Sequence, residues 1–172
     1  MKVAVVMGSD SDLPVMKETI STLDYFSVES FVSVTSAHRT PDKVREFIIK
    51  AEKQGCEVII AGAGMSAHLA GVIAAHTNLP VIGVPMKGGA LNGVDALYSM
   101  VQMPRGVPVA TLAIGKAGAV NAGILAVQIL ALKYDGLKNK LAEYKKDLAK
   151  SIEGIDEKLK KVGVEKYLQE KK

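Results

Sequence analysis

The feature that most constrains the fold is an alternation of short apolar runs with longer amphipathic stretches, which continues from the N-terminus to about residue 134. The apolar runs, of which residues 58–63 are an example, are rich in β-branched side chains and contain few polar positions. A strand that is apolar on both faces must be covered on both, and helices on the two sides of a parallel sheet provide that cover. The pattern therefore predicts an α/β fold, a three-layer α/β/α sandwich.

Strand and helix boundaries follow from the apolar periodicity and from the prolines and glycines that end each stretch. Five strands are predicted, at residues 3–7, 28–34, 58–63, 81–85 and 109–114. Five helices are predicted, at residues 13–23, 41–54, 67–76, 94–101 and 116–134. Pro41 stands in the first turn of the second helix, and Gly55 follows its end. Together these elements predict a flavodoxin-like, five-stranded parallel sheet.

A separate apolar stripe marks the C-terminal residues 135–172, which are surplus to a core formed by residues 1–134. Its members recur at spacings of three and four, as on one face of a helix: Leu137, Leu141, Tyr144, Leu148, Ile152, Ile155, Leu159 and Val162. We expect one long helical extension of a single domain spanning residues 1–172, packed on neighbouring subunits of a homo-oligomer. The Ala- and Gly-rich residues 117–123 fit either close packing within the chain or another subunit contact.

Composition narrows the class of protein. Cys56 is the only cysteine in 172 residues, so an intrachain disulfide and a multi-cysteine metal site are excluded. This cysteine usage, with no leader or membrane-spanning run evident, predicts a cytoplasmic protein without a membrane partner. Residues 137–172 hold 11 of the 22 Lys and Arg residues but 7 of the 18 acids, so the excess positive charge lies on the tail. The tail lysines are interleaved with acids, and we expect no nucleic-acid binding.

In a parallel sheet, ligands bind in the loops that follow the carboxyl ends of the strands. After residues 3–7 come Gly8, Ser9, Ser11 and Asp12, just before the first helix. Backbone N–H groups at a helix start and the two hydroxyls suit a phosphate, whereas the Asp12 carboxylate suits ribose hydroxyls. The alternative interpretation is that Ser11 or Asp12 only caps the helix. Neither a dinucleotide fingerprint nor a Walker loop is present.

The loop after residues 28–34 places an imidazole beside a guanidinium, in the order Ser36, Ala37, His38 and Arg39. Arginine offers a planar fork for phosphate or carboxylate, and histidine is the side chain best suited to proton transfer near neutral pH. The alternative is a surface loop in which Thr40 caps the next helix and His38 is merely solvated.

The loop after residues 58–63 is built almost entirely from small residues around one histidine, His68. Gly62 and Gly64 allow a flat ring to lie close to the backbone, and Ser66 can cap the following helix. We expect His68 in the first turn of that helix, where the dipole disfavours protonation of its ring. His76, at the end of the same helix, is expected to be structural.

These three loops, with residues 93–106 and 113–118, resemble the protein family that carries out phosphoribosylaminoimidazole carboxylation in purine biosynthesis. The resemblance runs in order along residues 3–133 and involves five separate motifs. Within the family, the segment from Ser36 to Pro41 is similar to the form that rearranges N5-carboxyaminoimidazole ribonucleotide. The sister form, which uses free CO2 and aminoimidazole ribonucleotide, typically has Lys where this chain has Arg39.

The resemblance implies an isomerase that moves a carboxyl group from N5 to carbon 4, giving 4-carboxy-5-aminoimidazole ribonucleotide, with no cofactor and no metal. It implies phosphate binding by Ser11, Ser36 and Arg39, ribose binding by Asp12 and proton transfer by His38. The ring and carboxylate would be held by Ser9 and by the backbone of residues 63–67, which include Ala63, Gly64, Ser66 and Ala67. His68 and Leu69 would also contact the substrate, with His68 contributing polarity or orientation. It also implies a cytoplasmic homo-octamer and a functional link to an ATP-dependent carboxyaminoimidazole ribonucleotide synthetase.

The chain departs from the family pattern at two places. Met65, Ser66 and Ala70 alter a segment that is often Gly-Gly-Ala-Ala-His-Leu-Pro-Gly, and Lys87 begins a segment that is commonly uncharged. Lys87 receives no role at this point, and residues 102–106 are expected to complete a neighbouring site. Two alternative functions stay open: a carboxylase that uses free CO2, and a non-catalytic flavodoxin-like module that binds a phosphorylated ligand.

Overall fold

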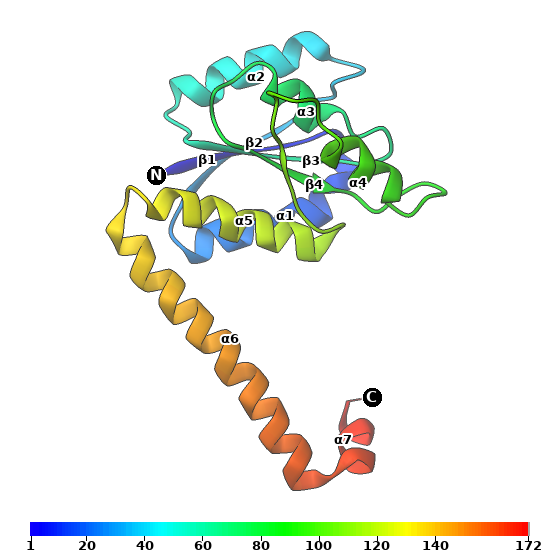
Figure 1. The fold of residues 1–172 in the computed structure, drawn as a ribbon, viewed down its shortest axis with the longest axis vertical. Coiled ribbons are helices and arrows are strands. Elements are labelled where there is room, and N and C mark those ends of the chain that lie inside the picture. Colours follow the sequence, from blue (N-terminus) through cyan, green and yellow to red (C-terminus); the bar gives the residue numbers. More distant parts are fainter. Residues whose placement is uncertain (172) are drawn as a thin grey trace. The chain divides into compact units, whose positions relative to one another are not determined.

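The computed structural model describes residues 1–171 and divides the chain into two compact units (Figure 1). The first unit comprises residues 1–133 and contains the sheet. The second begins at Tyr134, and the regular elements among its described residues are helices. No helix within residues 1–171 combines the length and the apolar character that crossing a membrane requires.

The first unit is built on a five-stranded parallel sheet with the order β2-β1-β3-β4-β5. Its strands are β1 (Lys2–Met7), β2 (Glu29–Val34), β3 (Val58–Ala63), β4 (Val81–Pro85) and β5 (Ala110–Thr111). This is the strand order of flavodoxin-like folds, so the predicted fold class is confirmed. Met7 lies beside Val34 on one side and Gly62 on the other, and Ala63 lies beside Pro85. Four strands therefore end at one edge, where the loops that follow them meet.

Helices cover both faces of this sheet (Figure 1). A one-turn 3-10 helix, η1 (Asp10–Asp12), leads into α1 (Leu13–Tyr25), which lies with α5 (Lys116–Ala131) on one face. On the other face lie α2 (Pro41–Lys53) and α3 (Leu69–Ala74), while α4 (Val94–Val101) packs against β4 and β5. All residues of β3 and β4 are buried, as their apolar sequences predict, whereas the edge strand β2 is partly exposed.

Several predicted boundaries differ from the structure by one to three residues; α5, for example, ends at Ala131 and not at residue 134. Two of the differences have a clear local reason. The fifth strand is only Ala110–Thr111, because the following chain keeps isolated bonds to β4 through Leu112 and Gly115 and then turns into α5. The third helix begins at Leu69 and not at residue 67. Met65 adopts a left-handed backbone conformation (φ 55°), which turns the chain away from helical geometry just before that point.

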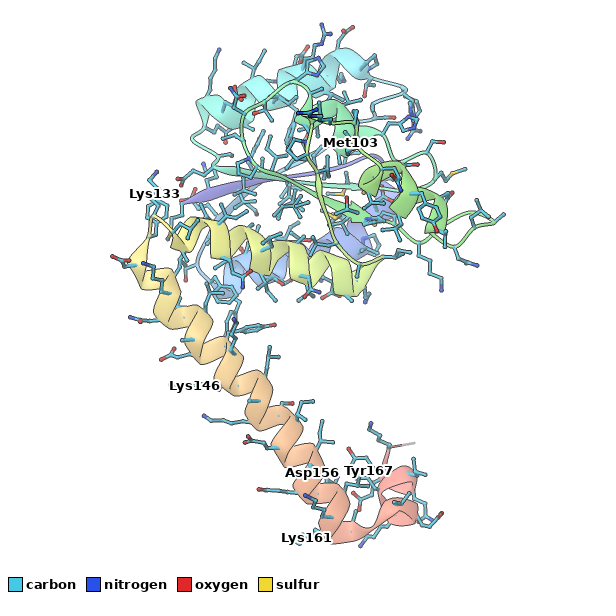
Figure 2. All side chains as sticks on the ribbon, viewed as in Figure 1. Met103, Lys133, Lys146, Asp156, Lys161 and Tyr167 are labelled. Atoms are coloured by element: carbon cyan, nitrogen blue, oxygen red, sulfur yellow. The ribbon has the colours of Figure 1, made fainter. Side chains whose placement is uncertain are left out.

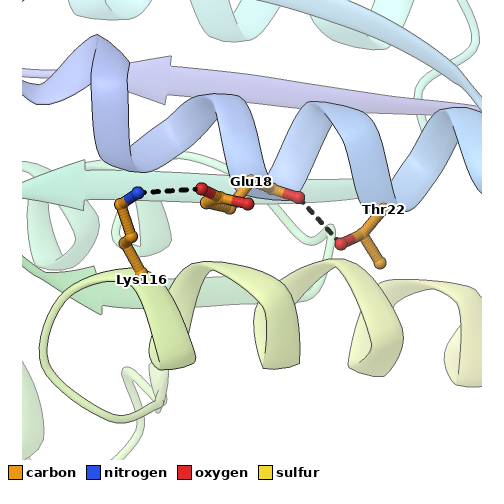
Figure 3. Close-up of polar contacts among 3 residues, drawn as sticks. All are labelled: Glu18, Thr22 and Lys116. Carbon is orange, nitrogen blue, oxygen red and sulfur yellow. Dashed lines mark hydrogen bonds and ion pairs between the residues drawn. The ribbon is translucent and has the colours of Figure 1, made fainter. Parts of the chain in front are cut away.

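The small residues of α5 allow it to pack closely on α1. The Thr19 hydroxyl of α1 is buried and donates a hydrogen bond to the carbonyl of Ala119 at 2.8 Å. A Cβ atom at Gly123 would lie 2.8 Å from Cβ of Thr22. At the start of α5, Lys116 pairs with Glu18 at 3.2 Å, and Thr22 donates to the Glu18 carbonyl (Figure 3). Packing within the chain thus accounts for these small residues; a subunit contact at the same helix stays a prediction.

The second unit consists of α6 (Asp135–Val162) and α7 (Val164–Glu170). Gly163, with φ 79°, ends the longer helix and lets the shorter one fold back (Figure 2). Lys158 pairs with Glu170 at 2.8 Å, and its ammonium lies 5.8 Å from the centroid of the Tyr167 ring. The helix predicted from the apolar stripe between Leu137 and Val162 is thus present as α6, and a short second helix follows it in the same extension.

Candidate active site

A cleft of about 830 Å³ opens at the carboxyl edge of the sheet, which is a usual size for a small-molecule site. Its walls are the loops that follow β1, β2, β3 and β4. Eleven of the twelve residues predicted from sequence line it: Ser9, Ser11, Asp12, Ser36, His38, Arg39, Ala63, Gly64, Ser66, His68 and Leu69. The structure therefore brings together side chains that the sequence places in three separate loops.

The loop after β1 is held by hydrogen bonds within itself. Ser9 caps η1 by accepting the Ser11 N–H at 3.3 Å, and the Asp12 carboxylate accepts the Ser9 N–H at 3.2 Å. Asp12, at the N-cap position of α1, makes no side-chain cap there, so the expected capping of that helix by Ser11 or Asp12 is not seen. The cap that forms is the one by Ser9 on the short helix η1. The Ser11 hydroxyl lies 2.9 Å from that of Ser9 at the exposed surface of the cleft.

Asp12 is the carboxylate that lines the cleft, and its environment shifts its pKa. Burial raises the pKa of its carboxyl above the usual value, and the nearby charge of Asp10 adds to this effect. The hydrogen bond from the Ser9 N–H opposes it by stabilising the ionised form. Such a half-buried acceptor, turned into a cleft, is suited to binding hydroxyl groups.

The loop after β2 is a closed turn that presents His38 and Arg39 to the cleft. The Thr40 hydroxyl accepts the Ser36 N–H at 3.0 Å and donates to the Ser36 carbonyl, so it closes the turn and does not cap α2. Arg39 donates its backbone N–H to the Ser36 hydroxyl. Its guanidinium reaches across to the Gly8 carbonyl at 3.3 Å, which carries the positive charge to the end of β1.

His38 and His68 meet across the cleft. Nε2 of His38 lies 2.8 Å from Nδ1 of His68, and the rings are nearly perpendicular at 84°. Such a bond needs a donor nitrogen on one ring and an acceptor nitrogen on the other, so the tautomers of the two rings are coupled. His68 stands at the position before the first residue of α3, not in its first turn as predicted, and its main partner is His38 and not the helix dipole.

The loop after β3 forms the wall between the two histidines and the sheet. A Cβ atom at Gly64 would lie 3.3 Å from Cβ of Met86, so only glycine leaves that neighbour undisturbed. Ser66 is exposed to the cleft and makes no side-chain cap on α3, contrary to expectation. Ala67 is buried in the hydrophobic core and does not line the cleft. Its side chain therefore forms no wall of the cleft, and the ligand contact expected of its backbone stays a prediction.

The loop after β4 supplies cleft residues to which the sequence analysis gave no role: Met86, Lys87, Gly88 and Gly89. The signal was available, because this loop also follows a buried parallel strand and carries a lysine beside two glycines. Gly8, Ala37 and Met65 also line the cleft. Residues 102–106 do not line it; there the Met103 side chain packs against Gly71 of α3 (Figure 2). No group of three metal-binding side chains occurs in the described part of the chain.

Comparisons with known proteins agree on one family. The sequence model of the AIR carboxylase family matches residues 2–151. The N5-carboxyaminoimidazole ribonucleotide mutase of Pyrococcus horikoshii is 54% identical over 168 residues, covering 98% of this chain and 94% of that protein. The enzyme of the same name from Thermotoga maritima is 50% identical over 170 residues, and the alignment covers 99% of this chain and 98% of that protein. The crystal structure of Treponema denticola PurE superposes with a TM-score of 0.84 at 28% identity, covering 92% of this chain and 98% of that one.

Proposed function

The chain belongs to the AIR carboxylase family and is a mutase of purine biosynthesis, and from this premise we propose that it converts N5-carboxyaminoimidazole ribonucleotide to 4-carboxy-5-aminoimidazole ribonucleotide. The observation that carries the proposal is the contact between His38 and His68 in a cleft that also contains Arg39. A proton-transfer group and a phosphate-binding group thus share one small-molecule site.

The arrangement of the cleft suggests how the nucleotide binds. Its phosphate is placed against Arg39, Ser11 and Ser36, where a guanidinium and two hydroxyls face the same space. Its ribose hydroxyls donate to the Asp12 carboxylate. The imidazole ring then lies along the loop after β3, where Gly64 allows close approach to the backbone.

Carboxyl transfer requires one proton to leave and return. Protonated His38 delivers its proton to N5 as the bond from N5 to the carboxyl carbon breaks, which releases CO2 within the cleft. Carbon 4 then attacks CO2 and forms the new carbon–carbon bond, and His38 removes the proton from carbon 4. The proton balance is zero, and holding CO2 beside carbon 4 favours recombination over escape. His68 orients the His38 ring through their 2.8 Å contact.

Two substrate mixtures distinguish this reaction from the carboxylase alternative. Purified protein is given either N5-carboxyaminoimidazole ribonucleotide or aminoimidazole ribonucleotide with bicarbonate, and formation of the carbon 4 carboxylate is followed. We expect turnover of the first, which an ATP-dependent synthetase would supply in the cell. Turnover of the second mixture alone would refute the mutase proposal.

Replacing His38 with asparagine tests the proton transfer. We expect kcat to fall about 10²- to 10⁴-fold, the usual contribution of a positioned acid or base, with substrate affinity retained. His76→Asn is the matched control, because the His76 side chain lies in the turn after α3, contacts the Val72 carbonyl and does not line the cleft. A His38→Asn protein with unchanged turnover would favour the non-catalytic binding module.

A further inference from the structure

Lys87 is a cation in the lining of the cleft, and the proposed substrate is strongly anionic. Besides the two histidines, the ionisable lining residues are Asp12, Arg39 and Lys87. The nucleotide carries a phosphate of nearly two negative charges and a carboxylate of one. Arg39 and ionised Asp12 cancel, so without Lys87 the only positive charge left to face these three negative charges would be that of protonated His38.

Lys87 and Arg39 stand at opposite ends of the cleft. Arg39 reaches Gly8 at the end of β1, whereas Lys87 follows β4. One strand, β3, lies between β1 and β4, so the ends of those two strands are separated by about 10 Å, two strand spacings. A nucleotide with its phosphate at Arg39 and its ring on the loop after β3 therefore directs the substituents of its ring toward Lys87.

The backbone before Lys87 is fixed, while its side chain is available. The Met86 N–H donates to the Ala63 carbonyl at 2.9 Å, which ties the base of the loop to β3. A Cβ atom at Gly93 would lie 3.2 Å from Cα of Lys87, so the chain is also tightly packed there. None of the ion pairs found within residues 1–171 involves Lys87, and the residue is exposed.

We propose that the Lys87 ammonium binds the carboxylate of the substrate and of the product, so that Lys87 distinguishes carboxylated from uncarboxylated aminoimidazole ribonucleotides. This assignment rests on the proposed function. Both the N5- and the carbon 4-carboxylated nucleotides carry the negative charge, whereas the CO2 released between them is neutral. Lys87 therefore stabilises the two bound states more than the step between them, and its removal raises KM while kcat does not fall.

Direct binding of two nucleotides to Lys87→Gln tests the assignment. We expect the affinity for 4-carboxy-5-aminoimidazole ribonucleotide, measured by calorimetry, to fall about tenfold, the effect of losing one hydrogen bond to a charged group. The affinity for 5-aminoimidazole ribonucleotide, which lacks the carboxylate, stays within about twofold of the wild-type value. Lys87→Arg restores tight binding of the carboxylated nucleotide because it keeps the charge.

Lys53→Gln is the control for charge removal, since Lys53 is exposed at the end of α2 and does not line the cleft. It should leave both affinities unchanged. If Lys87→Gln lowers the affinity for both nucleotides equally, Lys87 binds the phosphate that they share. If neither affinity changes, Lys87 binds neither the phosphate nor the carboxylate. Either outcome overturns the assignment. If the unaltered protein binds neither nucleotide, the proposed function itself fails, and the assignment with it.

Discussion

Replacing Gly62 with alanine adds one methyl group beneath the cleft, where β3 supports its floor. The new Cβ would lie 2.4 Å from Cε of Met86 and 2.6 Å from Sδ of Met16. Both methionines are buried, at 3% and 0% exposure, and Met86 also lines the cleft. Optimal carbon contacts are about 3.5–4.0 Å, so each atom must move by about 1 Å within a packed core.

The sign of the effect depends on whether the methionines can move without cost. In an uncrowded strand, Gly→Ala would stabilise the protein by about 0.5–1 kcal/mol, because glycine loses more backbone freedom on folding. Overpacking a dense core typically costs about 1–3 kcal/mol. Flexible side-chain ends relieve part of the crowding, yet the contacts are too short for both effects to cancel. We expect Gly62→Ala to destabilise the protein by about 1–2 kcal/mol.

Urea denaturation measures this change as a lower midpoint at unchanged m value. Because Met86 is displaced toward the cleft, nucleotide affinity should fall as well. Gly83→Ala is the comparison, since its Cβ would meet Met100 and Val109 at 3.0 Å, away from the cleft, so it should lose less stability and no affinity. Combining Gly62→Ala with Met86→Leu should cost less than the sum of the single changes, since the shorter side chain relieves one contact. A Gly62→Ala protein of wild-type stability and affinity would refute the reasoning.

Two other properties can be tested. Because burial raises the pKa of Asp12 in the folded state, ionising it costs stability as the pH rises above its unfolded value of 3.8, and this cost is absent below that value. Asp12→Asn keeps an acceptor for the Ser9 N–H, so it should raise Tm at pH 7 with a gain that shrinks below pH 3.8, and it should weaken ribose binding; a Tm difference independent of pH would contradict this. The exposed apolar residues Leu148, Ile152 and Ile155 of α6 lead us to expect a homo-oligomer, and a monomer mass in sedimentation at micromolar concentration would refute it.

The sequence alone determined the elements whose pattern is local. The apolar runs of β3 and β4 predict strands buried on both faces, and Pro41 fixes the start of α2, so the three-layer sandwich followed from periodicity and turn residues. The rule that parallel strands carry ligands at their carboxyl ends then selected loops that line the cleft. Residue chemistry within a loop, such as His38 beside Arg39, is visible without a structure.

Only the tertiary structure decided which of these groups meet. His38 and His68 are 30 positions apart in the chain, yet their rings touch. Their loops follow β2 and β3, and these two strands flank β1 in the sheet, so the two loops begin only two strand spacings apart. The left-handed turn at Met65 delays α3, which places His68 before the helix and sends Ala67 into the core. Lys87 joins the cleft because β4 pairs with β3. Periodicity records burial along one segment, whereas distances between loops depend on strand order and register, which no single segment contains.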